Sequence, residues 1–363
     1  MPMIKRRTLF ALSVAATAAC HRSSMEGFDF PAPPLPPGFP ARLHTEGNAI
    51  VDEQGRVRHF RGIAVPDVVW IAQHNDSSIG YFDERLFHTA WLWKANILRL
   101  SVMPAVYRRH GAAATLRALD VSVAFARKYG LHLIVTLHAI GYPPDGRYVS
   151  LKDWHYGELY QISDAEIAAF WELVARRYRH EPVVAFYELI NEPEHVRPAG
   201  TFDALDDAGP WTRWRDYAER LVDRIRAIDP DKIIIVGGME YAYDLSHVPE
   251  APVRRPNIVY ATHPYAAVNW RLPWQKAFLD TAATYPVFAT EFGWGKGMEE
   301  ERDKAPGVYH EAILEAFDTA GISWVAWSLS HVFSPSLLAK ADFSSATAYG
   351  DVIKAALAQR ASS

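Results

Sequence analysis

The chain has 363 residues, of which 49% are hydrophobic, so it can bury a large core as one α/β barrel or as two ordinary domains. Its formal net charge is −4 at pH 7, and no long basic or acidic block interrupts the sequence. Nucleic acid and anionic membrane surfaces are therefore not expected as main partners.

The N-terminus has the pattern of an export signal. Basic residues at 5–7 precede an apolar stretch, residues 9–19, which is too short to stay as a membrane-spanning helix. The single cysteine, Cys20, follows this stretch. The segment Thr-Ala-Ala-Cys at 17–20 resembles a bacterial lipoprotein processing site, except that its threonine stands where an apolar residue is usual. We expect residues 1–22 to direct export, either with Cys20 lipidated and held at a membrane or by ordinary cleavage and secretion.

Residues 23–43 are expected to be a linker. Prolines crowd the segment 31–40, which is typical of a semi-rigid polyproline II spacer. The remaining residues, 44–363, are expected to fold as a single domain. Because the chain has a single cysteine, no internal disulfide can form, and the fold depends on packing alone.

Eight short apolar segments have the composition of strands covered on both faces, because they are continuous and rich in β-branched or aromatic residues. They are residues 60–65, 97–102, 131–137, 183–190, 233–236, 258–262, 287–290 and 322–327. Helical patterns lie between most of them, at residues 83–94, 115–129, 164–179, 211–228, 274–284, 309–320 and 349–359. No good helical pattern separates the fifth and sixth strands, where residues 241–256 look irregular.

Eight strands with intervening helices predict an α/β fold of the (β/α)8 TIM-barrel type. The alternative is an open doubly wound sheet. A nucleotide-binding sheet of that kind would carry a glycine-rich turn after its first strand, but Pro-Asp-Val-Val-Trp stands there, at residues 66–70.

Two of the expected strands end at a glutamate. Asn191-Glu192-Pro193 follows the fourth strand, and Glu291 follows the seventh. The carboxyl ends of barrel strands meet on one face, so the two side chains are expected to lie together. Enzymes that cleave glycosidic bonds commonly use two carboxyl groups. One protonates the leaving oxygen, and the other attacks the anomeric carbon.

Three further strand-end residues have uses toward these glutamates. Arg99, in the second strand, would keep a nearby carboxylate ionised. Tyr265 would donate to the carboxylate of the nucleophile, and His263 would orient or tune the acid. A plainer interpretation of Arg99 is an ion pair with Glu188 inside the barrel, since Glu188 has the inward parity of Glu192. We expect Glu188 to be a structural, paired carboxylate.

Three other strand-end residues have uses toward a sugar. His138 and Asn191 would hydrogen-bond sugar hydroxyls, and Trp327 would form the floor of the subsite that holds the reacting sugar. Alone, a histidine or tryptophan at such a position is more often a core residue. Their joint placement at strand ends favours the functional interpretation.

These eight positions, in this order, resemble the glycoside hydrolase family 5 cellulases, which are retaining (β/α)8-barrel glycosidases. The resemblance covers residues 44–359. It implies that Glu192 is the acid/base and Glu291 the nucleophile, and that the other six positions bind substrate: Arg99, His138, Asn191, His263, Tyr265 and Trp327. It further implies an endo-acting β-1,4-glucanase. A β-mannanase, an exo-acting β-glucosidase or β-1,3-glucanase, and a carbohydrate-binding barrel without catalysis remain as alternatives.

A metal or other cofactor is not expected. The sequence has no His-Glu-x-x-His, no His-x-His on the first barrel strand and no cysteine pair. The expected partner is a polysaccharide or oligosaccharide, and the protein is expected to be a monomer. Six loop aromatics could stack on flanking sugars or pack their own loops: Trp70, Tyr142, Tyr148, Trp154, Trp270 and Trp294.

Overall fold

Eight parallel strands close into a barrel in the computed structural model, which describes residues 30–148, 159–194, 206–266, 272–294 and 306–361. The barrel strands are β3 (Arg61–Val65), β4 (Ile97–Val102), β5 (His132–Leu137), β8 (Val184–Glu188), β10 (Ile233–Gly237), β11 (Ile258–Thr262), β12 (Val287–Ala289) and β13 (Ser323–Ala326). They pair in chain order, and β13 closes the ring against β3. The predicted TIM barrel and all eight of its strands are confirmed.

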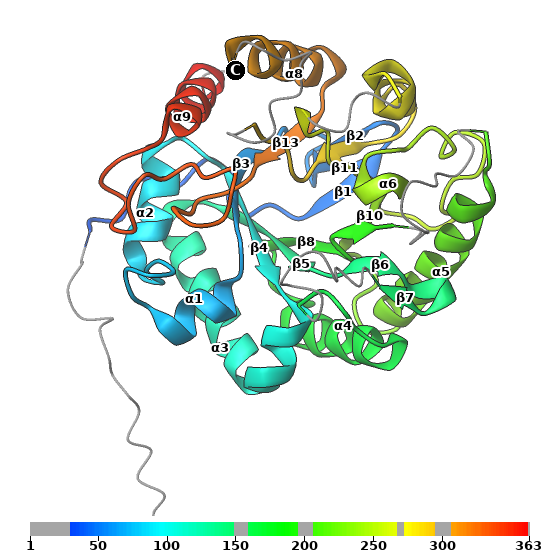
Figure 1. Ribbon diagram of the computed structural model, residues 1–363, viewed down its shortest axis with the longest axis horizontal. Coiled ribbons are helices and arrows are strands. Elements are labelled where there is room, and N and C mark those ends of the chain that lie inside the picture. The colour runs from blue at the N-terminus through cyan, green and yellow to red at the C-terminus, as the bar shows by residue number, and fades with distance from the viewer. Residues whose placement is uncertain (1–29, 149–158, 195–205, 267–271, 295–305, 362–363) are drawn as a thin grey trace, which may run out of the picture.

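A ring of helices surrounds the barrel (Figure 1). Its members are α1 (Val68–His74), α2 (Glu84–Leu92), α3 (Pro104–Tyr129), α4 (Asp164–Tyr178), α5 (Gly209–Arg226), a π-helix (Gln275–Leu279) that runs into α7 (Asp280–Ala282), α8 (Pro306–Ala320) and α9 (Ala348–Arg360). A short segment, α6 (Met239–Ala242), follows β10 at the end of the barrel. Every predicted helix is present within a few residues, apart from differences at α1 and α3.

Two helical segments were not predicted, for local reasons. Helix α1 occupies residues expected to be loop, and it starts because the side chain of Asp67 accepts a hydrogen bond from the amide of Trp70 at 2.7 Å. Helix α3 begins at Pro104, before the predicted start at residue 115. Its backbone leaves helical geometry at Gly111, where φ is 77°. The irregular stretch after β10 agrees with expectation, because Glu240 and Tyr241 in α6 have left-handed backbone.

The barrel interior is layered. Its lower part is apolar and includes a cluster of three aromatic rings: Phe60 lies with its ring centroid 5.3 Å from that of Phe186 and 6.4 Å from that of Phe288. Because side chains alternate across a strand, the next inward residue above Phe186 on β8 is Glu188. A polar layer therefore rests directly on the aromatic cluster.

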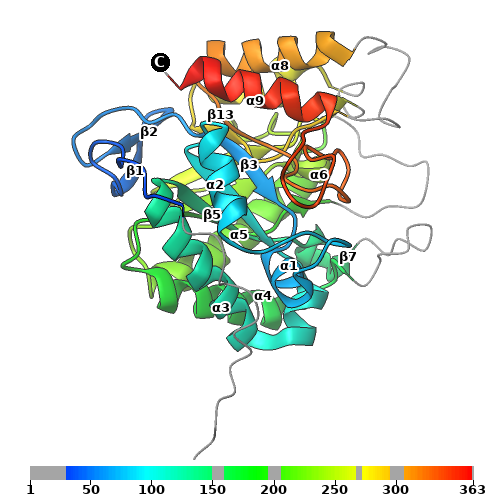
Figure 2. The same ribbon diagram turned by 90° about the vertical axis from the view of Figure 1, so that its left-hand side faces the viewer.

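A short antiparallel hairpin, β1 (Leu43–Glu46) and β2 (Ala49–Asp52), covers the N-terminal end of the barrel. Ile50 of the hairpin belongs to the interior apolar cluster. The amide of Thr45 donates to Oδ1 of Asn257 at 3.1 Å, just before β11. Figure 2 shows the hairpin at one end of the barrel and α6 with β7 (Arg147–Tyr148) at the other. The hairpin leaves the C-terminal ends of the strands as the open end.

The described part of the proline-rich segment lies against the barrel. Phe30 stacks on His88 of α2, with ring centroids 3.9 Å apart, and Phe39 packs edge-on against His132 at 5.0 Å. The predicted boundary at residue 44 stays a prediction, and residues 1–29, with Cys20, lie outside the described residues. Within the ranges described, no helix is long and apolar enough to cross a membrane.

The aromatic cluster predicts a large stability cost for losing Phe60, which is 1% exposed. Phe60→Ala should lower the free energy of unfolding by about 3–5 kcal/mol, because it leaves a cavity beneath the polar layer. Val57→Ala is the control, since Val57 is 53% exposed. Denaturant titration followed by tryptophan fluorescence measures both. Equal stability of the two variants would show that the base of the barrel carries little of the packing energy.

Candidate active site

Glu192 is held by a strand outside the barrel. It begins β9 (Glu192–Pro193), which pairs in parallel with β6 (Ile140–Tyr142), and its amide donates to the carbonyl of Ala139 at 3.1 Å. Pro193 packs against Gly237 at the end of β10, where a Cβ would lie 2.9 Å from the proline Cδ. A side chain at Gly237 would thus push the loop that carries Glu192.

Arg99 lies at the centre of the site and is fully buried. Its guanidinium makes three contacts of 2.6 Å, from Nε to Glu188 Oε2, from Nη1 to Glu291 Oε1 and from Nη2 to Asn191 Oδ1. Burial alone would lower the pKa of Arg99, but the adjacent charges of Glu188 and Glu291 outweigh it and raise the pKa. The ion pair with Glu188 and the contact with the strand-end glutamate, considered as alternatives above, are both present.

Glu291 is surrounded by donors. Besides Arg99, the hydroxyl of Tyr265 donates to Glu291 Oε2 at 2.8 Å. Burial raises the pKa of Glu291, while Arg99 and the Tyr265 hydrogen bond oppose that rise. The predicted role of Tyr265 toward this carboxylate is consistent with the contact. The two donors favour the ionised form of Glu291 and limit the rise of its pKa, but they do not cancel it.

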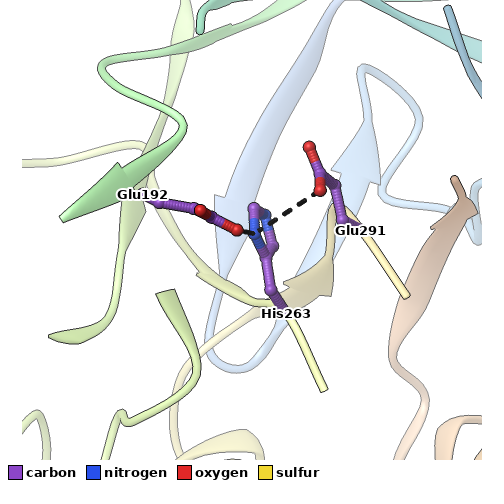
Figure 3. A group of neighbouring side chains, drawn as sticks. All are labelled: Glu192, His263 and Glu291. Atoms are coloured by element: carbon purple, nitrogen blue, oxygen red, sulfur yellow. Dashed lines mark hydrogen bonds and ion pairs between the residues drawn. The ribbon is translucent and has the colours of Figure 1, made fainter. Parts of the chain in front are cut away.

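Glu192 has a different environment. Its nearest ring partner is His263, whose Nδ1 lies 3.1 Å from Glu192 Oε1 (Figure 3). Burial, and then the negative charge of Glu291, raise the pKa of Glu192 well above its usual value. Burial, with the positive charge of Arg99, lowers the pKa of His263 well below its usual value, so the ring is neutral at neutral pH. Of the two strand-end glutamates, Glu192 therefore has the environment that more strongly favours the protonated form.

The two glutamates are close enough to act on one bond. One oxygen of Glu192, one oxygen of Glu291 and a ring nitrogen of His263 all lie within 4.8 Å of one another. Carboxyl groups about 5–5.5 Å apart are typical of retaining glycosidases, whereas inverting enzymes need about 6.5–9.5 Å to admit a water. The separation of the two glutamate oxygens fits a retaining glycosidase.

His138 and Trp327 form one wall of the site. Their rings stack with centroids 5.3 Å apart and planes at 17°, and His138 Nδ1 lies 4.0 Å from Glu291 Oε1. Burial, then the charge of Arg99, lower the pKa of His138 well below its usual value. Trp327 is 7% exposed. The structure thus brings together all eight residues that the sequence singled out.

Two further threonines, which the sequence does not single out, belong to the site. Thr136 and Thr290 both donate to Glu188, Thr290 to Oε1 at 2.6 Å and Thr136 to Oε2. Thr290 also lies 3.0 Å from Nε2 of His263. Thr136 stands two residues before His138 on β5, so the alternation of side chains could have identified it. Nothing in the pattern around Thr290 distinguishes it from an ordinary strand threonine.

The loop aromatics have different surroundings. Tyr142 is buried and donates to the carbonyl of Pro210 at 2.6 Å, so it packs its loop. Trp70 packs edge-on against Phe333, and Trp294 against His310. Tyr148 lies in β7. The other two, Trp154 and Trp270, lie outside the described residues.

Sequence comparison places the chain in a known family. The family model for cellulase (glycosyl hydrolase family 5) matches residues 51–332. The chain belongs to glycoside hydrolase family 5. The resemblance to this family that the sequence indicates is confirmed. Endoglucanase CelA of Streptomyces lividans is 27% identical over 325 residues, which cover 85% of this chain. This chain spans 62% of the length of that relative and 55% of endoglucanase E-5 of Thermobifida fusca, which is 28% identical.

Solved structures of family 5 enzymes share the fold over almost the whole domain. A β-glucanase from Saccharophagus degradans superposes with a TM-score of 0.77 at 29% identity, covering 92% of this chain and 98% of that one. The same β-glucanase has been solved with cellotetraose. The catalytic domain of a Thermobifida fusca endoglucanase gives a TM-score of 0.66 at 25% identity, covering 87% and 97%.

The converging oxygens and nitrogen of this family 5 site raise the question of a metal ion. His263 Nδ1 already faces Glu192, and both oxygens of Glu291 receive donors from Arg99 and Tyr265. We therefore predict that millimolar Mg²⁺, Ca²⁺, Mn²⁺ or Zn²⁺, or EDTA, leaves the thermal midpoint unchanged, since a ligand that binds the folded state would raise it. A midpoint that one ion raises and EDTA restores would establish a metal site.

Proposed function

We propose that the protein is a retaining β-glycoside hydrolase that cuts β-1,4-glucan chains internally. The observation that carries this is the asymmetric glutamate pair. Glu291 is held by a guanidinium and a phenol that favour its ionised form, and Glu192 faces a neutral imidazole with its pKa raised. A barrel that only binds carbohydrate would have no need for two adjacent carboxyls in such different electrostatic environments.

The first chemical step is attack by Glu291. Its carboxylate forms a bond to the anomeric carbon as the bond to the leaving oxygen breaks, and Glu192 gives its proton to that oxygen. The product is a covalent glycosyl-enzyme on Glu291. Arg99 and Tyr265 stay in contact with the oxygens of Glu291. They stabilise the negative charge that returns to this carboxylate when its bond to the anomeric carbon later breaks.

The second step reverses the roles. Glu192, now ionised, takes a proton from water while the water oxygen bonds to the anomeric carbon and the bond to Glu291 breaks. Two displacements at one carbon return the original anomeric configuration. Asn191 is anchored through its side-chain oxygen by Arg99, which leaves its amide NH₂ to donate to the sugar 2-hydroxyl.

The names of the relatives support β-glucan as the substrate, since several are called endoglucanases and a β-glucanase was solved with cellotetraose. The test is a panel of carboxymethyl cellulose, mixed-linkage glucan, β-1,3-glucan, mannan and aryl β-glucosides, with products sized by chromatography. We expect a rapid fall in viscosity with mixed cello-oligosaccharides. Release of glucose alone would indicate exo action. A preference for mannan or β-1,3-glucan would show that β-1,4-glucan is the wrong substrate.

The assignment of roles is tested by leaving-group dependence. Glu192→Ala should lose about 10³-fold or more in kcat on polysaccharide but keep measurable activity on a dinitrophenyl cellobioside, because that phenol leaves without a proton. Azide should then increase its rate. Glu291→Ala should be nearly inactive on both substrates. The reverse pattern would exchange the two roles, and near-normal turnover by either variant would remove that residue from catalysis.

We also propose that the protein is exported as a monomer and anchored through a lipidated Cys20. The support is the basic start, the apolar run and the cysteine that follows it. One acyl chain binds weakly, so stable anchoring would need more than one. The wild type should partition with membranes and Cys20→Ser should release it, with light scattering reporting the mass of one chain. A soluble wild-type protein would indicate ordinary secretion.

A further inference from the structure

The hydrogen bonds around His263 indicate which of its two ring nitrogens carries the hydrogen. Thr290, which is fully buried, has a hydroxyl with one hydrogen to donate. That hydrogen is directed at Glu188 Oε1, 2.6 Å away. Glu188 accepts rather than donates, because its other oxygen also receives Arg99 Nε at 2.6 Å and the hydroxyl of Thr136. Thr290 therefore has only lone pairs left for His263.

The second contact of the threonine then determines the tautomer. Thr290 Oγ1 lies 3.0 Å from Nε2 of His263, and since it can only accept there, Nε2 carries the hydrogen. A neutral imidazole with hydrogen on Nε2 has a bare Nδ1. That bare nitrogen faces Glu192 Oε1 at 3.1 Å, where a hydrogen bond forms when the carboxyl is protonated.

We propose that Thr290 is a positioning residue whose hydroxyl, anchored on Glu188, fixes the Nε2-protonated tautomer of His263 and so presents a bare Nδ1 to the acid/base Glu192. In the resting enzyme, protonated Glu192 donates a hydrogen bond to Nδ1 of His263. After the first step, ionised Glu192 faces the lone pair of that nitrogen until it takes a proton from water. This inference rests on the proposed function, in which Glu192 is the acid/base.

Other ionisable groups act on the same pair through their charges, whereas the hydrogen bonds to the ring of His263 within the described residues are those of Glu192 and Thr290. These ionisable groups reach Glu192 and His263 from several strand ends, namely Arg99, His138, Glu188, Glu194, Tyr265 and Glu291. Of these groups, Glu291 comes nearest to the ring, with its Oε2 3.9 Å from Nδ1. Its charge favours hydrogen on Nδ1, but that distance is too long for a hydrogen bond. The choice between the two ring nitrogens depends on which one meets an oxygen that can only accept, and Thr290 supplies that oxygen.

The direct test is ¹⁵N NMR of histidine-labelled enzyme near neutral pH, with the signals of His263 assigned by their loss in His263→Asn. Bare and protonated ring nitrogens resonate far apart, so the wild type should show hydrogen on Nε2. Hydrogen on Nδ1 in the wild type would overturn the proposal. This measurement needs no activity, so it separates this inference from the proposed function, which is tested by the leaving-group experiment on Glu192→Ala.

The functional test uses three variants at two threonines. Thr290→Val removes the hydroxyl at constant shape, Thr290→Ser keeps it, and Thr136→Val removes the other hydroxyl on the same carboxylate. In Thr290→Val the ring can put its hydrogen on Nδ1 and donate to ionised Glu192. The alkaline limb of kcat/KM, which reports the free general acid, should then move down by about one pH unit. Thr290→Ser and Thr136→Val should keep the wild-type limb.

Two results would contradict the functional claim. An unmoved limb in Thr290→Val, with the NMR signal shifted to the other tautomer, would show that the tautomer has no effect on the acid. An equal movement in Thr136→Val would assign the effect to the charge of Glu188. If Thr290→Val does not fold, the wild-type tautomer and Thr290→Ser still test the proposal.

Discussion

One buried cation organises the active end of this barrel. Arg99 is withdrawn from water, and its desolvation is offset by two carboxylates and an amide oxygen, all at 2.6 Å. These partners come from β8, from the turn that follows it and from the end of β12. The guanidinium therefore sets the position of two strand ends, those of β8 and β12, relative to β4, and its planar fork permits little adjustment.

The same cation determines the charge balance. One positive charge faces Glu188 and Glu291, so the layer is already negative by one when both are ionised. A further charge on Glu192 would add repulsion in a poorly hydrated space, which is a physical reason for the raised pKa of Glu192. The different environments of Glu192 and Glu291 thus follow from a single positive charge that contacts Glu188 and Glu291 but not Glu192.

Much of this arrangement is readable from the sequence. Continuous apolar strands and a glutamate at two strand ends predict the barrel and the position of its site, because parallel strands finish on one face. The less predictable parts depend on contacts between distant segments. The hairpin β1–β2 is too short and too weakly patterned to distinguish from a linker. Strand β6, which pairs with β9 and so positions Glu192, has only three residues, too few to show an alternation of polar and apolar side chains. Thr290 acquires its meaning only from the distances to Glu188 and His263.

The aromatic cluster beneath the polar layer links the base of the molecule to its active end. Phe186 and Glu188 are successive inward residues of one strand, and Phe288 precedes Thr290 in the same way on the chain through β12. Close-packed interiors transmit displacement, so a smaller ring at either position would shift a member of the hydrogen-bonded layer above it. In a library selected for turnover, these phenylalanines should tolerate as little change as the residues proposed to contact substrate, even though they lie below that site. Mutational tolerance alone would then overstate the size of the active site.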